Sequence, residues 1–281
     1  MLVFAAIAPH GDIAIEEARP SDRPELGSET RAGMTELARR FEAAEPDATI
    51  VMTPHNVHVT GSFAVVTAAE LRGGLGEFLP ESDDVAQLSL SCPADPDLAR
   101  SLLEGLEGAG LPAVGASFGG NVPAESVMPM DWGTLVPLWH LGGRSDPPVP
   151  AVVVSPSRDR PLEEHVDAGA AIGAVAAAAA KRIALVASAD HGHAHDAEGP
   201  YGFDPAAAEY DGRVVKLVGE NRLDRLLELG ELVATAKADS LWQLLMLQGA
   251  LGDGWRAELL SYEAPTYYGM LCAELRRDGP G

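Results

Sequence analysis

Short runs of apolar residues alternate along this chain with longer segments of helical character. The runs typical of strands span residues 2–8, 49–53, 113–116, 151–155 and 182–188. Each is apolar almost throughout, as expected of a strand covered on both faces. Helices are expected over residues 28–44, 95–108 and 162–181, with two or three more between 221 and 251 and extended segments at 259–263 and 267–272. The alternation predicts an α/β fold whose central sheet, mostly parallel or mixed, is covered by helices on both faces.

The composition favours one domain. Hydrophobic residues make up 46% of the 281 residues and charged residues 22%, which is typical of a globular protein with a well-formed core. Proline- and glycine-rich stretches at 20–27 and 142–150 are the candidate linkers, but neither separates regions of different composition. We therefore expect a single domain over residues 1–281.

The charge and the termini narrow the class of protein. A net charge of -22 disfavours nucleic acid and anionic membrane surfaces as partners, because binding to either depends on clusters of Lys and Arg. Cys92 and Cys272 lie far apart in the sequence, which excludes a disulfide framework and a cysteine-type zinc site. The N-terminus lacks the basic region of a signal peptide, and the alanine-rich stretch at 168–180 is too short to span a bilayer. We expect a cytoplasmic protein.

Histidines follow several of the predicted strands. His10 and His55 each stand at a Pro-His step where an apolar run ends, and the run at 182–188 is followed by Asp190, His193 and His195. In open α/β sheets ligands bind outside the carboxyl ends of the strands, so these side chains can converge on one point. A single strand-end histidine is as often a solvated loop residue as a ligand, but three strand ends repeat the pattern.

The histidines point to a particular kind of metal site. Neutral imidazole is the commonest metal ligand, and two histidines with one carboxylate leave open positions on Fe(II) for a substrate and dioxygen. A closed structural zinc site would need four protein ligands, usually including cysteines, and this chain offers no such cysteines.

Four segments carry a family resemblance. APHGD, TPHNVHV, SADHGH and KADSLWQLLMLQGAL resemble, in order and spacing, the catalytic subunit of protocatechuate 4,5-dioxygenase, a class III extradiol ring-cleavage dioxygenase. The superfamily also contains Memo-like proteins. The resemblance covers nearly the whole chain and implies a single catalytic domain.

The resemblance implies a set of metal ligands. The family's first two iron ligands fall on His10 and His55. Its third ligand, a glutamate near the C-terminus, falls on Ser240, which cannot replace a carboxylate. We therefore assign the third ligand to the adjacent Asp239, with Glu263 as the reserve, because a shift of one residue on a helix turns a side chain by about 100 degrees.

The resemblance also implies residues that act on the substrate. His193 falls on the family's catalytic histidine, and His195 is a second candidate for proton transfer. Trp132 replaces a histidine of the family's active site, so it either contacts the ring, where it would favour a flat apolar group over a carboxylate, or packs in the core. We expect His58 and Asp190 in the substrate pocket. His58 could also replace His55, three residues before it, as a metal ligand.

The implied activity is oxygen-dependent opening of an aromatic ring. The cofactor would be Fe(II), and the substrates would be O2 and a small aromatic molecule of the catechol or 2-aminophenol type. The resemblance further suggests a homo-oligomer, with or without a small partner subunit. Two alternatives follow from Trp132 and the missing glutamate: a Memo-like metal-binding scaffold that cleaves no ring, and a zinc-dependent hydrolase on the same site.

Overall fold

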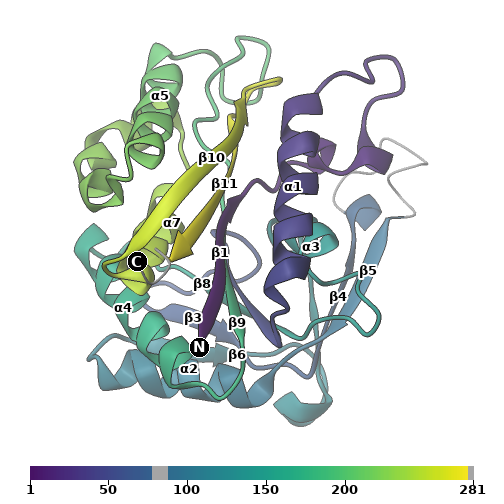
Figure 1. Cartoon of the computed structure of the whole chain (residues 1–281), viewed down its shortest axis with the longest axis vertical. Helices are drawn as coiled ribbons and strands as arrows, with labels where there is room; N and C mark the ends of the chain where they lie inside the picture. Colours follow the sequence, from purple (N-terminus) through teal and green to yellow (C-terminus); the bar gives the residue numbers. More distant parts are fainter. Residues whose placement is uncertain (78–87, 278–281) are drawn as a thin grey trace.

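The computed structural model describes residues 1–77 and 88–277 and shows a large mixed sheet between two layers of helices (Figure 1). The strand order is β10-β11-β1-β9-β2-β8-β3-β6. The strands of this sheet span Leu2–Ala8 (β1), Ala48–Met52 (β2), Phe63–Val66 (β3), Ala113–Ala116 (β6), Ala151–Ser155 (β8), Ile183–Ser188 (β9), Trp255–Glu263 (β10) and Met270–Arg277 (β11). The sheet confirms the predicted fold class.

The centre of the sheet is parallel. Strand β9 pairs in parallel with both β1 and β2, and β2 pairs in parallel with β8. Strands β11 and β3 run antiparallel to their neighbours β1 and β8 and make the sheet mixed. Because β1, β9 and β2 are adjacent and parallel, the segments that follow them emerge together at one edge of the sheet.

Helices cover both faces. Side chains of β1 alternate between two cores: Ala5 and Ile7 pack in one, and Phe4 and Ala6 in the other. The first core is closed by α2 (Pro96–Gly108), α4 (Leu162–Ala178), α5 (Pro205–Gly219) and α7 (Leu241–Leu251), and the second by α1 (Ser28–Ala44) and α3 (Trp132–His140). Strict alternation of buried side chains is what a strand covered on both faces requires.

Close packing of α4 against α7 fixes the position of the C-terminal helix. A Cβ at Gly169 would lie 2.0 Å from the carbonyl oxygen of Met246, and a Cβ at Gly249 would lie 2.0 Å from that of Val166. Only glycine permits so close an approach of two helix backbones. These glycines therefore allow α4 and α7 to pack closely, and this packing fixes the position of α7 and of the segment that precedes it.

Smaller elements complete the described chain. A second sheet has the order β5-β4-β7. Its strands span Glu70–Gly74 (β4), Ser89–Pro93 (β5) and Val127–Pro129 (β7); the short helices are Asp12–Ala14 (η1), Glu16–Ala18 (η2), Leu75–Glu77 (η3), Pro123–Glu125 (η5), Leu223–Leu232 (η6) and Val233–Ala236 (α6). Over residues 1–77 and 88–277, no helix combines the length and apolar character needed to cross a bilayer.

Most predicted elements agree with the structure to within a few residues at their ends, but the extended segment predicted at 267–272 lies at Met270–Arg277. Helix α5 and strands β3, β4, β5 and β7 were not predicted. Strands β1, β6 and β8 have the predicted bounds, and α4 ends at Ala178, three residues before the predicted end. Helix α3 was not predicted. It contains Pro137, a residue that normally disrupts a helix interior because it lacks an N–H and clashes with the preceding turn.

Candidate metal and active site

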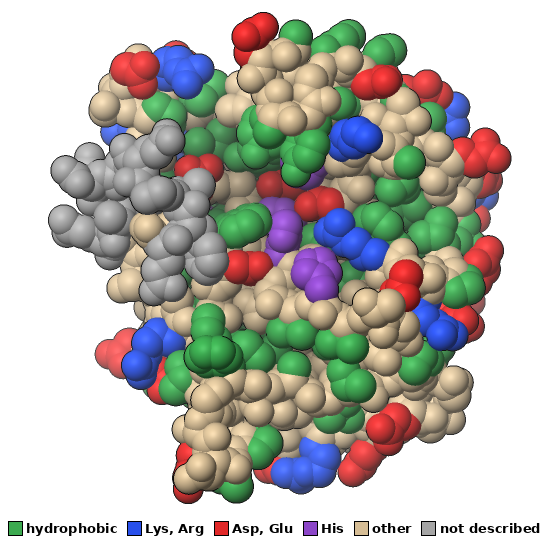
Figure 2. Space-filling view, turned by 180° about the vertical axis from the view of Figure 1, so that it is seen from behind, with side chains coloured by type: hydrophobic (Ala, Val, Ile, Leu, Met, Phe, Trp, Pro, Cys, Tyr) green, Lys and Arg blue, Asp and Glu red, His purple; other side chains and the backbone are tan. Residues whose placement is uncertain are grey.

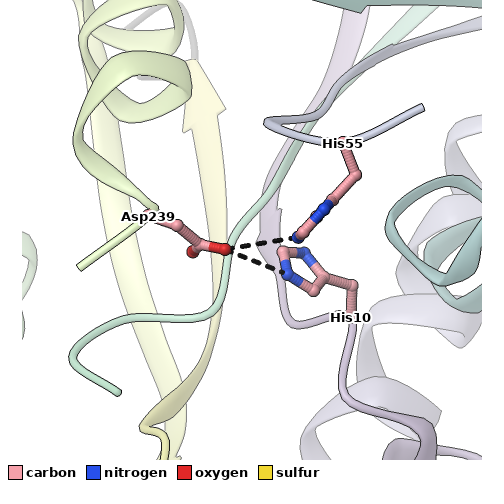
Figure 3. Close-up of side chains that lie close together, drawn as sticks. All are labelled: His10, His55 and Asp239. Atoms are coloured by element: carbon pink, nitrogen blue, oxygen red, sulfur yellow. Dashed lines mark ion pairs between the residues drawn. The ribbon is translucent and has the colours of Figure 1, made fainter. Parts of the chain in front are cut away.

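Two histidines and one aspartate converge at the edge of the sheet. His10 follows β1, His55 follows β2, and Asp239 precedes α7 (Figure 3). Oδ2 of Asp239 lies 3.3 Å from Nε2 of His55 and 3.7 Å from Nε2 of His10. The ligand atoms of all three residues lie within 4.8 Å of one another, which makes them a candidate site for one metal ion. The predicted convergence of His10 and His55 is thus present in the structure.

The electrostatics of this group favour a cation. His10 is 1% exposed, and Oδ1 of Asp239 is buried without a hydrogen-bond partner among the described residues. Burial opposes protonation of His10, but the carboxylates of Asp190 and Asp239 outweigh it and raise its pKa to about 9. Burial also disfavours the charged form of Asp239, yet the close imidazoles of His10 and His55 keep its pKa well below the usual range. In the metal-free protein a proton on His10 therefore balances carboxylate charge that a metal ion would otherwise neutralise.

The carboxylate that faces the histidines belongs to Asp239 and not to its neighbour. Oγ of Ser240 lies 2.9 Å from Nδ1 of His191 and 2.9 Å from the hydroxyl oxygen of Tyr210, away from the metal candidate. Glu263, the reserve, accepts a hydrogen bond at 2.6 Å from the backbone N–H of Thr30 in α1. The geometry therefore favours Asp239 over both alternatives.

A buried hydroxyl orients the first histidine. Ser188, the last residue of β9, donates a hydrogen bond of 2.6 Å to the carbonyl oxygen of Gly133. Its oxygen lies 3.0 Å from Nδ1 of His10. Because the single hydroxyl proton is already engaged, Ser188 must accept from Nδ1–H, which leaves Nε2 of His10 as the nitrogen available to a metal.

An irregularity in α3 supplies the acceptor for that hydroxyl. Pro137 has no N–H to donate to the carbonyl of Gly133 one turn earlier, so this carbonyl is free to accept from Ser188. Gly133 also has to be a glycine, because a Cβ there would lie 2.5 Å from Oγ1 of Thr53 and 2.9 Å from Cβ of His55. The unusual proline thus belongs to the framework that positions both histidines.

The metal candidate opens into a cavity of about 710 Å³. The cavity is large enough to admit a substituted single-ring molecule. Figure 2 shows histidine and acidic side chains together near the centre of this face, with basic side chains beside them. Aromatic side chains from four segments line the cavity: Trp132, Tyr201, Trp242, Tyr267 and Tyr268. Trp132 packs against the second core and also lines the cavity, where its ring centroid lies 4.8 Å from that of His55.

His193 lies in the same cavity with one nitrogen available. Its Nδ1 donates a hydrogen bond of 2.8 Å to the carbonyl oxygen of His191, so Nε2 carries the lone pair. Its ring stacks on Tyr268 at a centroid distance of 5.6 Å. This tautomer and position suit a side chain that accepts a proton from a substrate.

The other predicted residues divide between the cavity and its surroundings. Asp190 lines the cavity, and its Oδ1 accepts a hydrogen bond of 3.0 Å from the backbone N–H of His10. His58 is exposed and His195 is largely buried, and neither is among the described residues that line the cavity. Nε2 of His195 donates a hydrogen bond of 2.8 Å to the buried carboxylate of Asp211, which ties the segment after β9 to α5.

Several residues of the site and its surroundings were not predicted to have a role there. Ser188 could have been suggested by its place at the end of a strand just before Asp190. Arg158 lies in the loop after β8, outside the four family segments. Lys237 and Trp242 lie within the segment KADSLWQLLMLQGAL, but only the packing of α7 shows that they reach the cavity.

A known protein family matches the chain over the region that contains the metal candidate. The family described as the catalytic LigB subunit of aromatic ring-opening dioxygenase matches residues 4–271. The chain belongs to this family. The match contains both histidines and the aspartate of the metal candidate. Metal binding is typical of the LigB family, and the histidine–histidine–aspartate group provides a candidate site for it.

Two individual proteins are similar over nearly the whole chain. Protein CA_C1420 of Clostridium acetobutylicum is 20% identical over 273 residues, which cover 95% of this chain and 56% of that protein. The chain therefore spans about half the length of this curated relative. The crystal structure of uncharacterized protein JW3007 from Escherichia coli K12 has 18% sequence identity and a TM-score of 0.62, covering 97% of this chain and 99% of that one. This second likeness shows a common fold.

Proposed function

We propose that this protein is a non-heme Fe(II)-dependent extradiol dioxygenase that opens the ring of a catechol or 2-aminophenol type substrate with O2. The observation that carries the proposal is the convergence of His10, His55 and Asp239 within 4.8 Å in an aromatic-lined cavity. Two histidines and a carboxylate are the ligand set of non-heme Fe(II) oxygenases, which leave positions for substrate and dioxygen. Membership of the LigB family supports the same chemistry.

The residues present fit such a metal ion. The donors are two imidazole nitrogens and one carboxylate. Oδ1 of Asp239 has no hydrogen-bond partner among the residues that the structure describes, and Ser188 holds His10 in the tautomer that a ligand requires. Bound Fe(II) would supply the electron transfer between the substrate and dioxygen that amino-acid side chains cannot perform.

The chain itself would bind the ring and move protons. Aromatic side chains such as Trp132 and Tyr268 would hold a flat ring and exclude water from the cavity. Nε2 of His193 would accept the proton of a substrate hydroxyl and later return it, acting as general base and then as general acid. We propose His193, and not His195, for this role, because Asp211 holds His195 outside the cavity.

The decisive experiment is anaerobic reconstitution of the metal-free protein with Fe(II). Oxygen uptake would then be measured with catechol, protocatechuate, gallate and 2-aminophenol. We expect uptake with at least one of them and a coloured ring-fission product. A protein that holds iron and takes up no oxygen with any of the four would contradict the proposal.

The same experiment separates the alternatives. A Memo-like scaffold would retain metal without oxygen uptake, whereas a zinc-dependent hydrolase would carry stoichiometric zinc and turn over without oxygen. Ser188 gives no support to a serine hydrolase, since its side chain is buried and its proton is donated to Gly133. The coordination set and the aromatic cavity therefore favour the dioxygenase.

A further inference from the structure

Tyr268 lies between two parts of the proposed active site. It belongs to the loop between β10 and β11, and its side chain lines the cavity although only 7% of it is exposed. Its ring stacks on that of His193, with 5.6 Å between the centroids and 27° between the planes. The same ring packs against Gly11, the residue after His10. One buried ring thus contacts both the proposed general base and the segment of a proposed metal ligand.

Gly11 shows how closely this ring fits. A Cβ at Gly11 would lie 2.5 Å from Cε2 of Tyr268 and 2.5 Å from its hydroxyl oxygen. The backbone of Gly11 has φ of -61° and ψ of 136°, a conformation that any residue can adopt. Glycine is therefore needed at this position because of the ring of Tyr268 and not because of the backbone.

Backbone hydrogen bonds hold the segment of Tyr268 against the segment of His193. The N–H of His191 donates to the carbonyl oxygen of Gly269 at 2.8 Å, and the N–H of Gly269 donates to that of Gly192 at 3.1 Å. Each bond joins the residue after Tyr268 to a residue within two positions of His193. The two stacked rings are thus carried by segments that are fixed to each other.

The stack adds a restraint that the hydrogen bond of His193 does not provide. The bond from Nδ1 to the carbonyl oxygen of His191 fixes one edge of the imidazole. The ring can still turn about that edge unless another surface lies against its face. Tyr268 provides such a surface, and stacked aromatic pairs have a preferred relative orientation. Tyr201 also approaches the imidazole, edge-on at 5.9 Å, but it is 56% exposed and restrains the ring less.

From these contacts we propose that Tyr268 is a positioning residue for His193, and that its aromatic ring fixes the plane of the imidazole and so the direction of Nε2. The inference rests on the proposed function, because it takes His193 to be the group that moves the substrate proton. The hydroxyl of Tyr268 has no part in this role. Burial and the nearby carboxylates of Asp190 and Asp12 raise the pKa of Tyr268 well above its usual value, so the hydroxyl keeps its proton near neutral pH.

Kinetics of three variants separate the ring from the hydroxyl. Tyr268→Phe keeps the ring and Tyr268→Leu removes it. Phe41→Leu is the control, because it removes a buried ring that contacts Phe4 at 5.5 Å in the second core. We expect Tyr268→Leu to lower kcat roughly tenfold at full iron content, the factor that one aromatic contact is worth. KM should change less, because little of Tyr268 is exposed to a substrate, and the other two variants should keep the wild-type kcat.

Nitrogen NMR of the histidine side chains gives a readout that needs no oxygen chemistry. In metal-free protein with ¹⁵N-labelled histidine, measured above the usual imidazole pKa, the ring signals report which nitrogen carries the proton. The signals of His193 are assigned by their loss in His193→Asn. We expect a single Nδ1–H tautomer in wild type, Tyr268→Phe and Phe41→Leu. Tyr268→Leu should show a mixture of tautomers.

A second variant guards against misfolding of Tyr268→Leu. Gly11→Ala keeps Tyr268 and presses a Cβ against its ring, so it should disturb the same His193 signals. A folded Tyr268→Leu or Gly11→Ala protein with wild-type His193 signals would overturn the inference. An equal loss of kcat in Tyr268→Phe and Tyr268→Leu would also overturn it, because the hydroxyl would then be responsible. If wild type consumed no oxygen, the spectra would still decide the inference, and only the dioxygenase would be lost.

Discussion

Nε2 of His55 lies 3.3 Å from Oδ2 of Asp239, although the two residues come from opposite halves of the chain. The histidine follows a central strand, whereas the aspartate is placed by the packing of α7 on α4. The pair therefore exists only when the C-terminal helix is docked. Metal retention tests this arrangement directly.

Replacement of a proposed ligand should abolish metal binding. We expect His10→Ala, His55→Ala and Asp239→Ala each to lower the iron content from about one ion per chain to near zero, because two remaining ligands hold a divalent ion poorly. Elemental analysis after anaerobic reconstitution measures this. Glu263→Gln is the control and should keep its iron, and full iron in Asp239→Ala would move the carboxylate ligand elsewhere.

Ser188→Ala should weaken metal binding without removing a ligand. Loss of the hydroxyl that accepts from Nδ1 of His10 frees the ring to adopt the wrong tautomer, and partners of this kind contribute about 10- to 100-fold in metal affinity. Competition with a chelator measures the affinity. Ser155→Ala is matched, since that buried strand-end hydroxyl donates to the carbonyl of His55 and touches no imidazole nitrogen. Equal affinities in the two variants would argue against the role of Ser188.

His193→Asn should separate catalysis from metal binding. We expect kcat to fall by about 10²- to 10⁴-fold, the usual contribution of a general base, while the iron content stays at the wild-type level. Oxygen uptake and elemental analysis on the same sample measure both. A variant that lost its iron would instead make His193 part of the metal site.

His195→Gln should affect stability more than turnover. Asp211 is buried, and weakening its hydrogen bond with His195 should lower the free energy of unfolding by about 1–3 kcal/mol. Denaturant titration measures the loss, and kcat/KM of the folded variant should stay within a few-fold of wild type. A much larger loss of kcat at full iron content would return His195 to the catalytic group.

Acidification should destabilise the protein through His140. Burial lowers the pKa of this histidine to about 4, although its hydrogen bond to the carbonyl of Ala14 opposes the shift. Between pH 6.5 and 4 the unfolded chain binds a proton at this position and the folded chain does not, so stability falls as the pH falls through this window. His140→Gln, which can still donate to Ala14, should reduce that fall by about 2 kcal/mol. Unfolding curves with the same pH dependence in both proteins would contradict this.

Much of the site was predictable because it depends on local features. A strand is recognised from its apolar run, and the residue at its end is read directly from the sequence. Once β1, β9 and β2 are taken as parallel neighbours, His10, His55 and the segment of His193 must emerge at one edge. The third ligand was predicted on weaker grounds, since Asp239 and Ser240 differ only in which way each side chain points.

The sequence alone determined the α/β class, most of the central strands and the histidines at their ends, because these follow from patterns within a few neighbouring residues. Only the tertiary structure decided which partner each side chain meets. Ser188 faces His10 because Pro137 leaves a carbonyl free in α3, and His195 turns to Asp211. Such choices depend on the packing of segments far apart in the chain, where a rotation of one helix exchanges the residues that face the cavity.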